Sequence, residues 1–119
     1  MPSNFFNEYG NIVITEEVIA QISGVVATEC YGVVGMAARN VKDGIAHLLR
    51  NDSLTKGIAV TLSENKANID FHVIVEYGTK ISAVADNLMS TVKYKVNDSL
   101  GIEVERIRIF IEGVRVDKE

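Results

Sequence analysis

Two stretches of the chain repeat apolar residues at the spacing of an amphipathic helix. The first follows Thr15, which suits a helix N-cap because Glu16 and Glu17 come next, where negative charge complements the helix dipole. The second and longer stretch begins after Thr79 and stops at Gly101, a residue suited to a helix C-terminus. The predicted buried stripes are Val18, Ile19, Ile22, Val25 and Val26 in the first helix, and Ile81, Val84, Ala85, Leu88, Val92, Val96 and Leu100 in the second.

Other stretches alternate apolar and polar residues, which is typical of strands. Residues 10–14 form a short first strand, residues 58–77 form a hairpin that turns at 63–66, and residues 106–112 form the last strand. After Gly113 the apolar phase flips to the other face, which predicts a β-bulge at this glycine.

Between the first helix and the hairpin, Asp43 can cap a short helix with Ile45, Leu48 and Leu49 on its buried face. The complete order is therefore β-α-α-β-β-α-β. This order predicts a two-layer α+β fold, with a mainly antiparallel sheet and helices packed on one of its faces. We expect a flexible N-terminal tail over residues 1–9, a single domain over residues 10–116 and a frayed C-terminus over residues 117–119.

The other face of the predicted sheet carries mostly polar side chains and is expected to meet solvent. Ile74 and Phe110 are the two large apolar side chains on it. Exposed apolar residues on a solvated sheet face can mark a contact surface. The sequence therefore predicts a protein-contact face made of Ile74, Glu76, Arg106, Arg108 and Phe110.

Composition narrows the classes of protein to which the chain can belong. Its 119 residues are 47% apolar and 24% charged, with a formal net charge of −4, which is ordinary for one globular domain. The negative charge disfavours broad binding to nucleic acid, and no apolar run is long enough for direct insertion into a membrane. With one cysteine and no signal-peptide pattern at the start, we expect a cytoplasmic protein.

Residues that could carry chemistry are scattered through the sequence. The candidate metal ligands Cys30, His47 and His72 have no metal-site spacing, so we expect no metal site. Cys30 falls at the end of the first helix, where the dipole disfavours a thiolate, and it is interpreted as a core residue. No phosphate-binding loop, dinucleotide fingerprint or nucleophile elbow is present. We therefore expect no catalytic residues and no cofactor.

One motif supports an alternative function. Residues Gly32, Val33, Val34 and Gly35 form a GxxG after the first helix, and the element order up to the long helix matches that of a KH domain. A GxxG loop binds the phosphate backbone of RNA through its amides. Because the two central residues are valines, we favour a turn packed on the core over an RNA-binding loop.

Several blocks of the sequence, in the right order over about residues 9–116, resemble the alkaline shock protein family, also called the Gls general-stress or envelope stress response family, in its YloU-like branch. The most specific block is 75–78, Val-Glu-Tyr-Gly, together with Lys80, Ile81, Val84, Ala85 and Asn87. The other blocks are 10–19, 22–24, 32–36, 43–45, 48–49, 56–58, Gly101, Ile107, Ile109, Ile111 and 112–114.

The resemblance implies a protein of a Gram-positive bacterium that acts in envelope stress or homeostasis through protein contacts and without catalysis. It also implies a choice of protein partners: a small membrane-anchor protein, which would place the chain at the membrane periphery, a neighbouring fatty-acid or dihydroxyacetone kinase-like protein that the chain would regulate, or further copies of itself in a homo-oligomer. The family pattern consists mainly of core and turn positions, so no binding residue is transferred from it.

Overall fold

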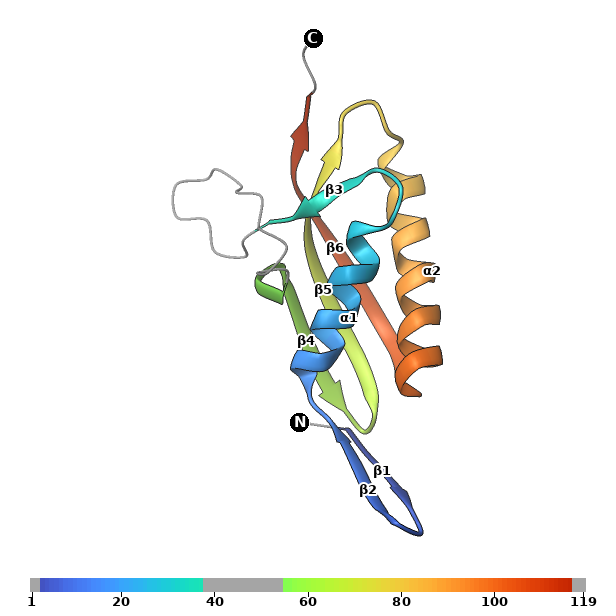
Figure 1. Cartoon of the computed structure of the whole chain (residues 1–119). Coiled ribbons are helices and arrows are strands. Elements are labelled where there is room, and N and C mark those ends of the chain that lie inside the picture. The colour runs from blue at the N-terminus through green and yellow to red at the C-terminus, as the bar shows by residue number, and fades with distance from the viewer. Residues whose placement is uncertain (1–2, 38–54, 117–119) are drawn as a thin grey trace.

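The computed structural model of the protein describes residues 3–37 and 55–116. Two helices and six strands occur in these residues (Figure 1). In chain order they are β1 (Ser3–Asn7), β2 (Gly10–Ile14), α1 (Glu16–Thr28), β3 (Val33–Met36), β4 (Ile58–Ser63), β5 (Lys66–Glu76), α2 (Ile81–Leu100) and β6 (Glu103–Arg115).

Strand β5 is the centre of the main sheet. β4 and β3 pair antiparallel with successive parts of one edge of β5, and β6 runs parallel to it along the other edge. The expectation of a mainly antiparallel sheet holds for three of the four strand pairings in the described residues, while the longest pairing, β5 with β6, is parallel. The physical reason is α2, a crossover helix that carries the chain back to the starting end of β5, as a parallel pair requires.

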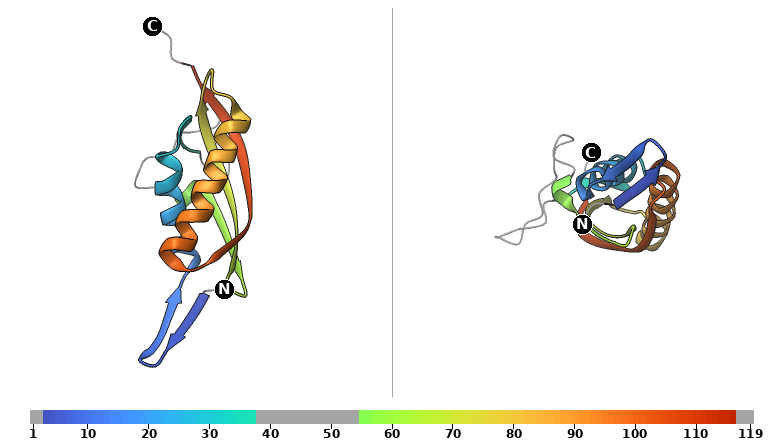
Figure 2. Two further views of the ribbon diagram at one scale, coloured as in Figure 1. Left: turned by 90° about the vertical axis from the view of Figure 1, so that its right-hand side faces the viewer. Right: turned by 90° about the horizontal axis from the view of Figure 1, so that it is seen from below.

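Both helices lie on the same side of this sheet, and none of the described residues forms a helix over the opposite side (Figure 2). The α+β prediction is thus confirmed. Every second side chain of β5 faces the helices and is fully buried, and the matching helix residues are almost fully buried too. The set comprises Ala67, Ile69, Phe71, Val73 and Val75 on β5, Ile19 on α1, and Val84, Leu88, Val92 and Val96 on α2.

The predicted buried stripes of the two helices are confirmed except at Val25 and Ile81, which are exposed. α1 starts after Thr15, but the Thr15 side chain forms no capping hydrogen bond. Instead, a carboxylate oxygen of Glu16 accepts a hydrogen bond from the backbone N–H of Leu62, 2.9 Å away. This bond ties the first turn of the helix to β4.

The N-terminal segment differs from the sequence-based prediction. Residues 3–7, expected to be flexible, form β1, which pairs with β2 in a hairpin that projects from one end of the molecule (Figures 1 and 2). Asn4 and Asn65 connect the hairpin to the turn between β4 and β5 through hydrogen bonds of 3.3 and 3.4 Å. β2 supplies backbone hydrogen-bond partners to residues 3–7, and the sequence of residues 1–9 alone gave no sign of these partners.

Two predicted segments cannot be compared with the structure, and a third prediction concerns membrane-spanning helices. The short helix over 43–49 and the frayed residues 117–119 lie outside the described residues. In the ranges 3–37 and 55–116, neither helix combines the length and the apolar character needed to cross a bilayer.

Candidate functional site

The candidate site is the outer face of the sheet, defined as the side chains of β5 and β6 that point away from the helices. The parallel register aligns these side chains in pairs because both strands alternate with the same period. Three pairs follow one another along the face: Asn68 with Arg106, Asp70 with Arg108, and His72 with Phe110.

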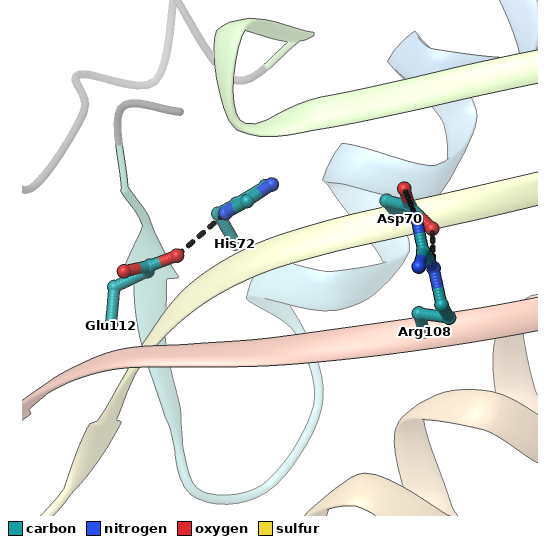
Figure 3. A network of polar contacts seen from close by, with 4 residues as sticks. All are labelled: Asp70, His72, Arg108 and Glu112. Carbon is teal, nitrogen blue, oxygen red and sulfur yellow. Dashed lines mark hydrogen bonds and ion pairs between the residues drawn. The ribbon is translucent and has the colours of Figure 1, made fainter. Parts of the chain in front are cut away.

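Asp70 and Arg108 form a two-pronged ion pair in the middle of the outer face (Figure 3). The Arg108 Nε and Nη2 groups donate to the two Asp70 carboxylate oxygens over 2.8 and 2.6 Å. The hydrogen bond from Arg108 lowers the pKa of Asp70, and partial burial opposes it to a smaller extent. The carboxylate is thereby held ionised and fixed in position.

Phe110 lies between two polar side chains. Its ring stacks on the His72 imidazole with centroids 4.8 Å apart and planes 10° apart, and the Arg108 guanidinium carbon is 5.3 Å from its centroid. His72 Nδ1 in turn contacts a Glu112 carboxylate oxygen at 2.7 Å (Figure 3). Phe110 is 39% exposed, so its ring is held by these neighbours and the residue is still presented to solvent.

The structure brings together three of the five predicted contact residues. Arg106, Arg108 and Phe110 follow one another on the outer side of β6. Glu76 lies at the far end of β5, where its carboxylate is 3.1 Å from Nη2 of Arg115. Ile74 was predicted wrongly: it is only 8% exposed, because it lies in the central strand with β3 paired to one edge and β6 to the other.

The side chains that organise this face are not among the five predicted contact residues. Asp70, His72, Glu112 and Arg115 each contact one of the predicted residues or their neighbours. Alternation placed Asp70 and His72 on the polar side of their strand, which was the available signal. The pairings themselves depend on the parallel register of β5 with β6, and strand periodicity does not reveal register between strands.

A hollow of about 620 Å³ lies at the β4 end of the outer face. Carboxylates, guanidinium groups and a hydroxyl group surround it, so it suits a polar surface with charges of both signs better than an apolar ligand. Its walls are formed by Ala59, Thr61, Asn68, Asp70, Glu105, Arg106 and Arg108.

Gly32 lies in a turn, but the other three residues of the GxxG segment lie in a strand, so the expected turn covers only its start and the alternative RNA-binding loop is not formed. Val33 to Met36 form β3, with Val33 opposite Val75 and Gly35 opposite Ile74. The Val33 N–H donates to the Cys30 carbonyl at 3.2 Å, so this amide already has a hydrogen-bond partner. A segment that extends the sheet cannot arrange its amides around a phosphate as a KH loop does, because strand pairing fixes their directions.

The remaining candidate groups for chemistry are Cys30 and His72. Cys30 is buried, its thiol donates to the Val26 carbonyl at 3.3 Å, and burial raises its pKa, which disfavours the reactive thiolate. His72 is engaged with Glu112 and Phe110 on the outer face. Among residues 3–37 and 55–116, no three or more His, Cys, Asp or Glu side chains gather where they could hold a metal ion. His47 lies outside the described residues.

Comparison with known proteins assigns the chain to a group. The model of the alkaline shock protein 23 family, described as having a cell envelope-related function, matches residues 4–116. The uncharacterized protein YloU of Bacillus subtilis is 46% identical over 110 residues, which are 92% of each chain. The uncharacterized protein Spy1614 of Streptococcus pyogenes is 33% identical over 90% of this chain and 89% of its own. The B. subtilis protein YqhY, also uncharacterized, is 28% identical over 91% of this chain and 79% of its own. No solved structure matches the chain closely enough to be counted as similar.

Proposed function

This chain belongs to the alkaline shock protein 23 family, and from that premise we propose that it is a non-enzymatic protein-interaction or scaffold protein of the cell envelope, with the outer face of its sheet as the contact surface. The family description supports the envelope role, and the relatives come from Bacillus and Streptococcus, which are Gram-positive bacteria. The observation that carries the contact surface is Phe110, an aromatic side chain held in an ordered but exposed position between Arg108 and His72.

The composition of the outer face supports recognition of a protein. Aromatic and arginine side chains dominate the binding energy of many interfaces, and both are present here at the centre of the face. Arg108 is fixed by Asp70, and Phe110 is fixed by His72, so little side-chain freedom remains to be lost on binding. A partner that fits would place an apolar group on Phe110 and carboxylates near Arg106 and Arg108.

The surroundings of Cys30 and His72 support a role without catalysis. The buried Cys30 has a raised pKa, which disfavours a nucleophilic thiolate, and the His72 ring is held by a carboxylate and an aromatic ring. Two kinds of partner follow from the resemblance to alkaline shock proteins: a small membrane-anchor protein, which would recruit the chain to the membrane periphery, or a kinase-like neighbour that the chain would regulate.

Affinity purification of the tagged protein from its own bacterium, grown under envelope stress, tests this proposal. The contact variant is Arg108→Ala with Phe110→Ala, which truncates the centre of the outer face. The control variant is Tyr94→Ala with Lys95→Ala, which removes the same two classes of side chain from the exposed side of α2, where Tyr94 is 65% exposed.

We expect mass spectrometry to recover the partner with the wild-type chain and the control variant, and to recover it at least about tenfold less with the contact variant. The identity of the recovered protein decides between a membrane anchor and a kinase-like partner. Equal recovery by the contact variant, with an unchanged circular dichroism spectrum, would mean that the outer face is not the contact surface.

A further inference from the structure

Three segments that are distant in the sequence meet at the end of the molecule opposite the β1–β2 hairpin (Figures 1 and 2). The backbone N–H of Glu76 donates to the Gly32 carbonyl at 2.9 Å, which holds the turn before β3 against the end of β5. The backbone N–H of Tyr77 donates to the Arg115 carbonyl, also at 2.9 Å, which adds the end of β6. These backbone hydrogen bonds fix the three segments side by side.

A hollow of about 480 Å³ lies where these segments meet. One part of its wall comes from residues 31–34, a second part from residues 76–79 and a third from Arg115. This volume is in the range of sites that bind ligands, and loops fixed on a rigid sheet often form such sites.

Two exposed tyrosines line this hollow from different segments. Tyr31 is 71% exposed and Tyr77 is 70% exposed. Neither hydroxyl has a hydrogen-bond partner in the part of the chain that the structure describes. Each tyrosine therefore offers a large apolar ring and a free hydroxyl donor, a combination that is common where proteins bind other proteins.

The charged groups of the hollow neutralise each other. Glu76 and Arg115 are the charged side chains of its described lining, and their ion pair spans 3.1 Å. A phosphate or carboxylate ligand would meet the Glu76 carboxylate as well as the Arg115 guanidinium. The lining therefore favours an uncharged ligand.

We propose that this hollow binds a proline-rich segment of a partner protein in the polyproline II conformation. Such segments bind in grooves lined by aromatic side chains. The polyproline II conformation has no internal hydrogen bonds, so its carbonyl groups are free to accept from the hydroxyls of Tyr31 and Tyr77, while its proline rings cover the tyrosine rings. A proline-rich segment is already extended before it binds, so it loses little conformational freedom.

An uncharged saccharide fits the same lining less well. Its hydroxyls would each need a donor or acceptor, because a buried polar group without a partner costs free energy. Glu76 and Arg115 are engaged with each other, and the Thr79 hydroxyl donates to the Glu76 carbonyl at 2.7 Å. The two tyrosine hydroxyls are too few to satisfy a saccharide, but they suffice for two carbonyl groups of a peptide.

This site goes beyond the proposed contact role, and the two can fail separately. The contact role uses Arg108 and Phe110 at the centre of the outer face, and it is measured by partner recovery. The contact variant Arg108→Ala with Phe110→Ala should therefore bind a proline-rich peptide as the wild type does. Loss of peptide binding in this variant would mean that the hollow is not a separate site.

Nuclear magnetic resonance of the isotope-labelled full chain, titrated with an acetylated decaproline peptide, tests the site. We expect saturable shifts of the amide signals of residues 31–34 and 76–79, with a Kd of about 1 mM or lower. A decapeptide of alternating glycine and serine is the control ligand, because it is uncharged and equally long but flexible, and it should cause no such shifts. Maltotriose serves as the saccharide probe.

Tyr31→Ala and Tyr77→Ala should each weaken decaproline binding by at least about tenfold, because each removes both the ring and the hydroxyl. Tyr31→Phe keeps the ring and should weaken binding less than Tyr31→Ala does. Tyr94→Ala is the matched control: it removes a tyrosine that is 65% exposed from α2, and it should bind decaproline as the wild type does.

A wild-type chain whose amide signals do not shift at millimolar decaproline overturns the proposal. Equal binding of the glycine-serine peptide also overturns it, as does binding of maltotriose in place of decaproline at these residues. Decaproline binding that both alanine variants retain, with spectra that show an intact fold, would mean that the tyrosines do not form the site.

Discussion

The two faces of β5 and β6 are built from the same two strands and show how differently the two sides of a sheet are specified. On the inner face, side chains such as Phe71 are fully buried under the helices. On the outer face, Asp70 and Arg108 meet in an ion pair that remains partly exposed to solvent. The inner face therefore determines the stability of the fold, whereas the outer face can vary its side chains at little cost in stability and is free to determine binding.

Phe71→Ala is the largest test of this difference. Phe71 lies opposite Ile58 on one side and Ile109 on the other, with none of its surface exposed. Its truncation leaves a cavity in the core and should lower the free energy of unfolding by about 3–5 kcal/mol. Urea denaturation measures the change.

Phe110→Ala is the matched control on the outer face. It removes the same side chain, but from a position that is 39% exposed, and should cost only about 1 kcal/mol for the lost ring contacts. Similar losses for the two variants would mean that the outer face contributes to stability as much as the core does.

Sequence predicted the inner face well because burial leaves a periodic signal. The alternation of Ile69, Phe71 and Val73 marked the core side of β5, and the stripe from Val84 to Val96 marked the buried side of α2. The change of apolar phase after Gly113 also predicted a β-bulge. The pairing with β5 has an irregularity there, since it passes from Ile111 to Gly113 without a partner for Glu112.

Features that depend on pairing between distant segments were not predictable in the same way. β3 has four residues and β1 has five, too few to show a reliable period. Ile74 was placed correctly on the polar side of its strand, but its burial depends on neighbouring strands. The ion pair of Asp70 with Arg108 depends on a parallel register across 38 residues of sequence, which the order of elements alone does not fix.

Gly32→Ala tests how tightly the inner face is packed at a glycine. Gly32 has a φ of +83°, and a Cβ at this position would overlap Cγ2 of the buried Val84. Gly32→Ala should lower the free energy of unfolding by roughly 2–3 kcal/mol, because it combines a left-handed backbone with overpacking against a stiff β-branched residue.

Gly78→Ala separates these two causes. Gly78 has a similar φ of +92°, but a Cβ there would have no other atom within 4 Å. Thermal unfolding should therefore show only the backbone cost, about 1 kcal/mol. If both alanine variants lose the same stability, the backbone strain alone accounts for the effect and the packing of Val84 on Gly32 does not.

The smallest expected effect concerns the pH dependence of the outer face. The hydrogen bond from Arg108 lowers the pKa of Asp70, so the pair stabilises the folded state above the ordinary pKa range of aspartate, and this stabilisation is lost as pH falls through the lowered pKa.

Asp70→Asn keeps the side chain's size but removes its charge. It should cost less than about 1 kcal/mol at neutral pH, because solvent and salt screen a partly exposed pair. When the pH falls below the ordinary pKa range of aspartate, the difference in unfolding free energy between the wild type and Asp70→Asn should shrink towards zero in urea denaturation. Asp98→Asn, which removes a carboxylate from the exposed side of α2, is the control and should not reproduce this convergence. A difference that persists in acid would mean that Asp70 acts through packing, and the outer face would then resemble the inner one at this position.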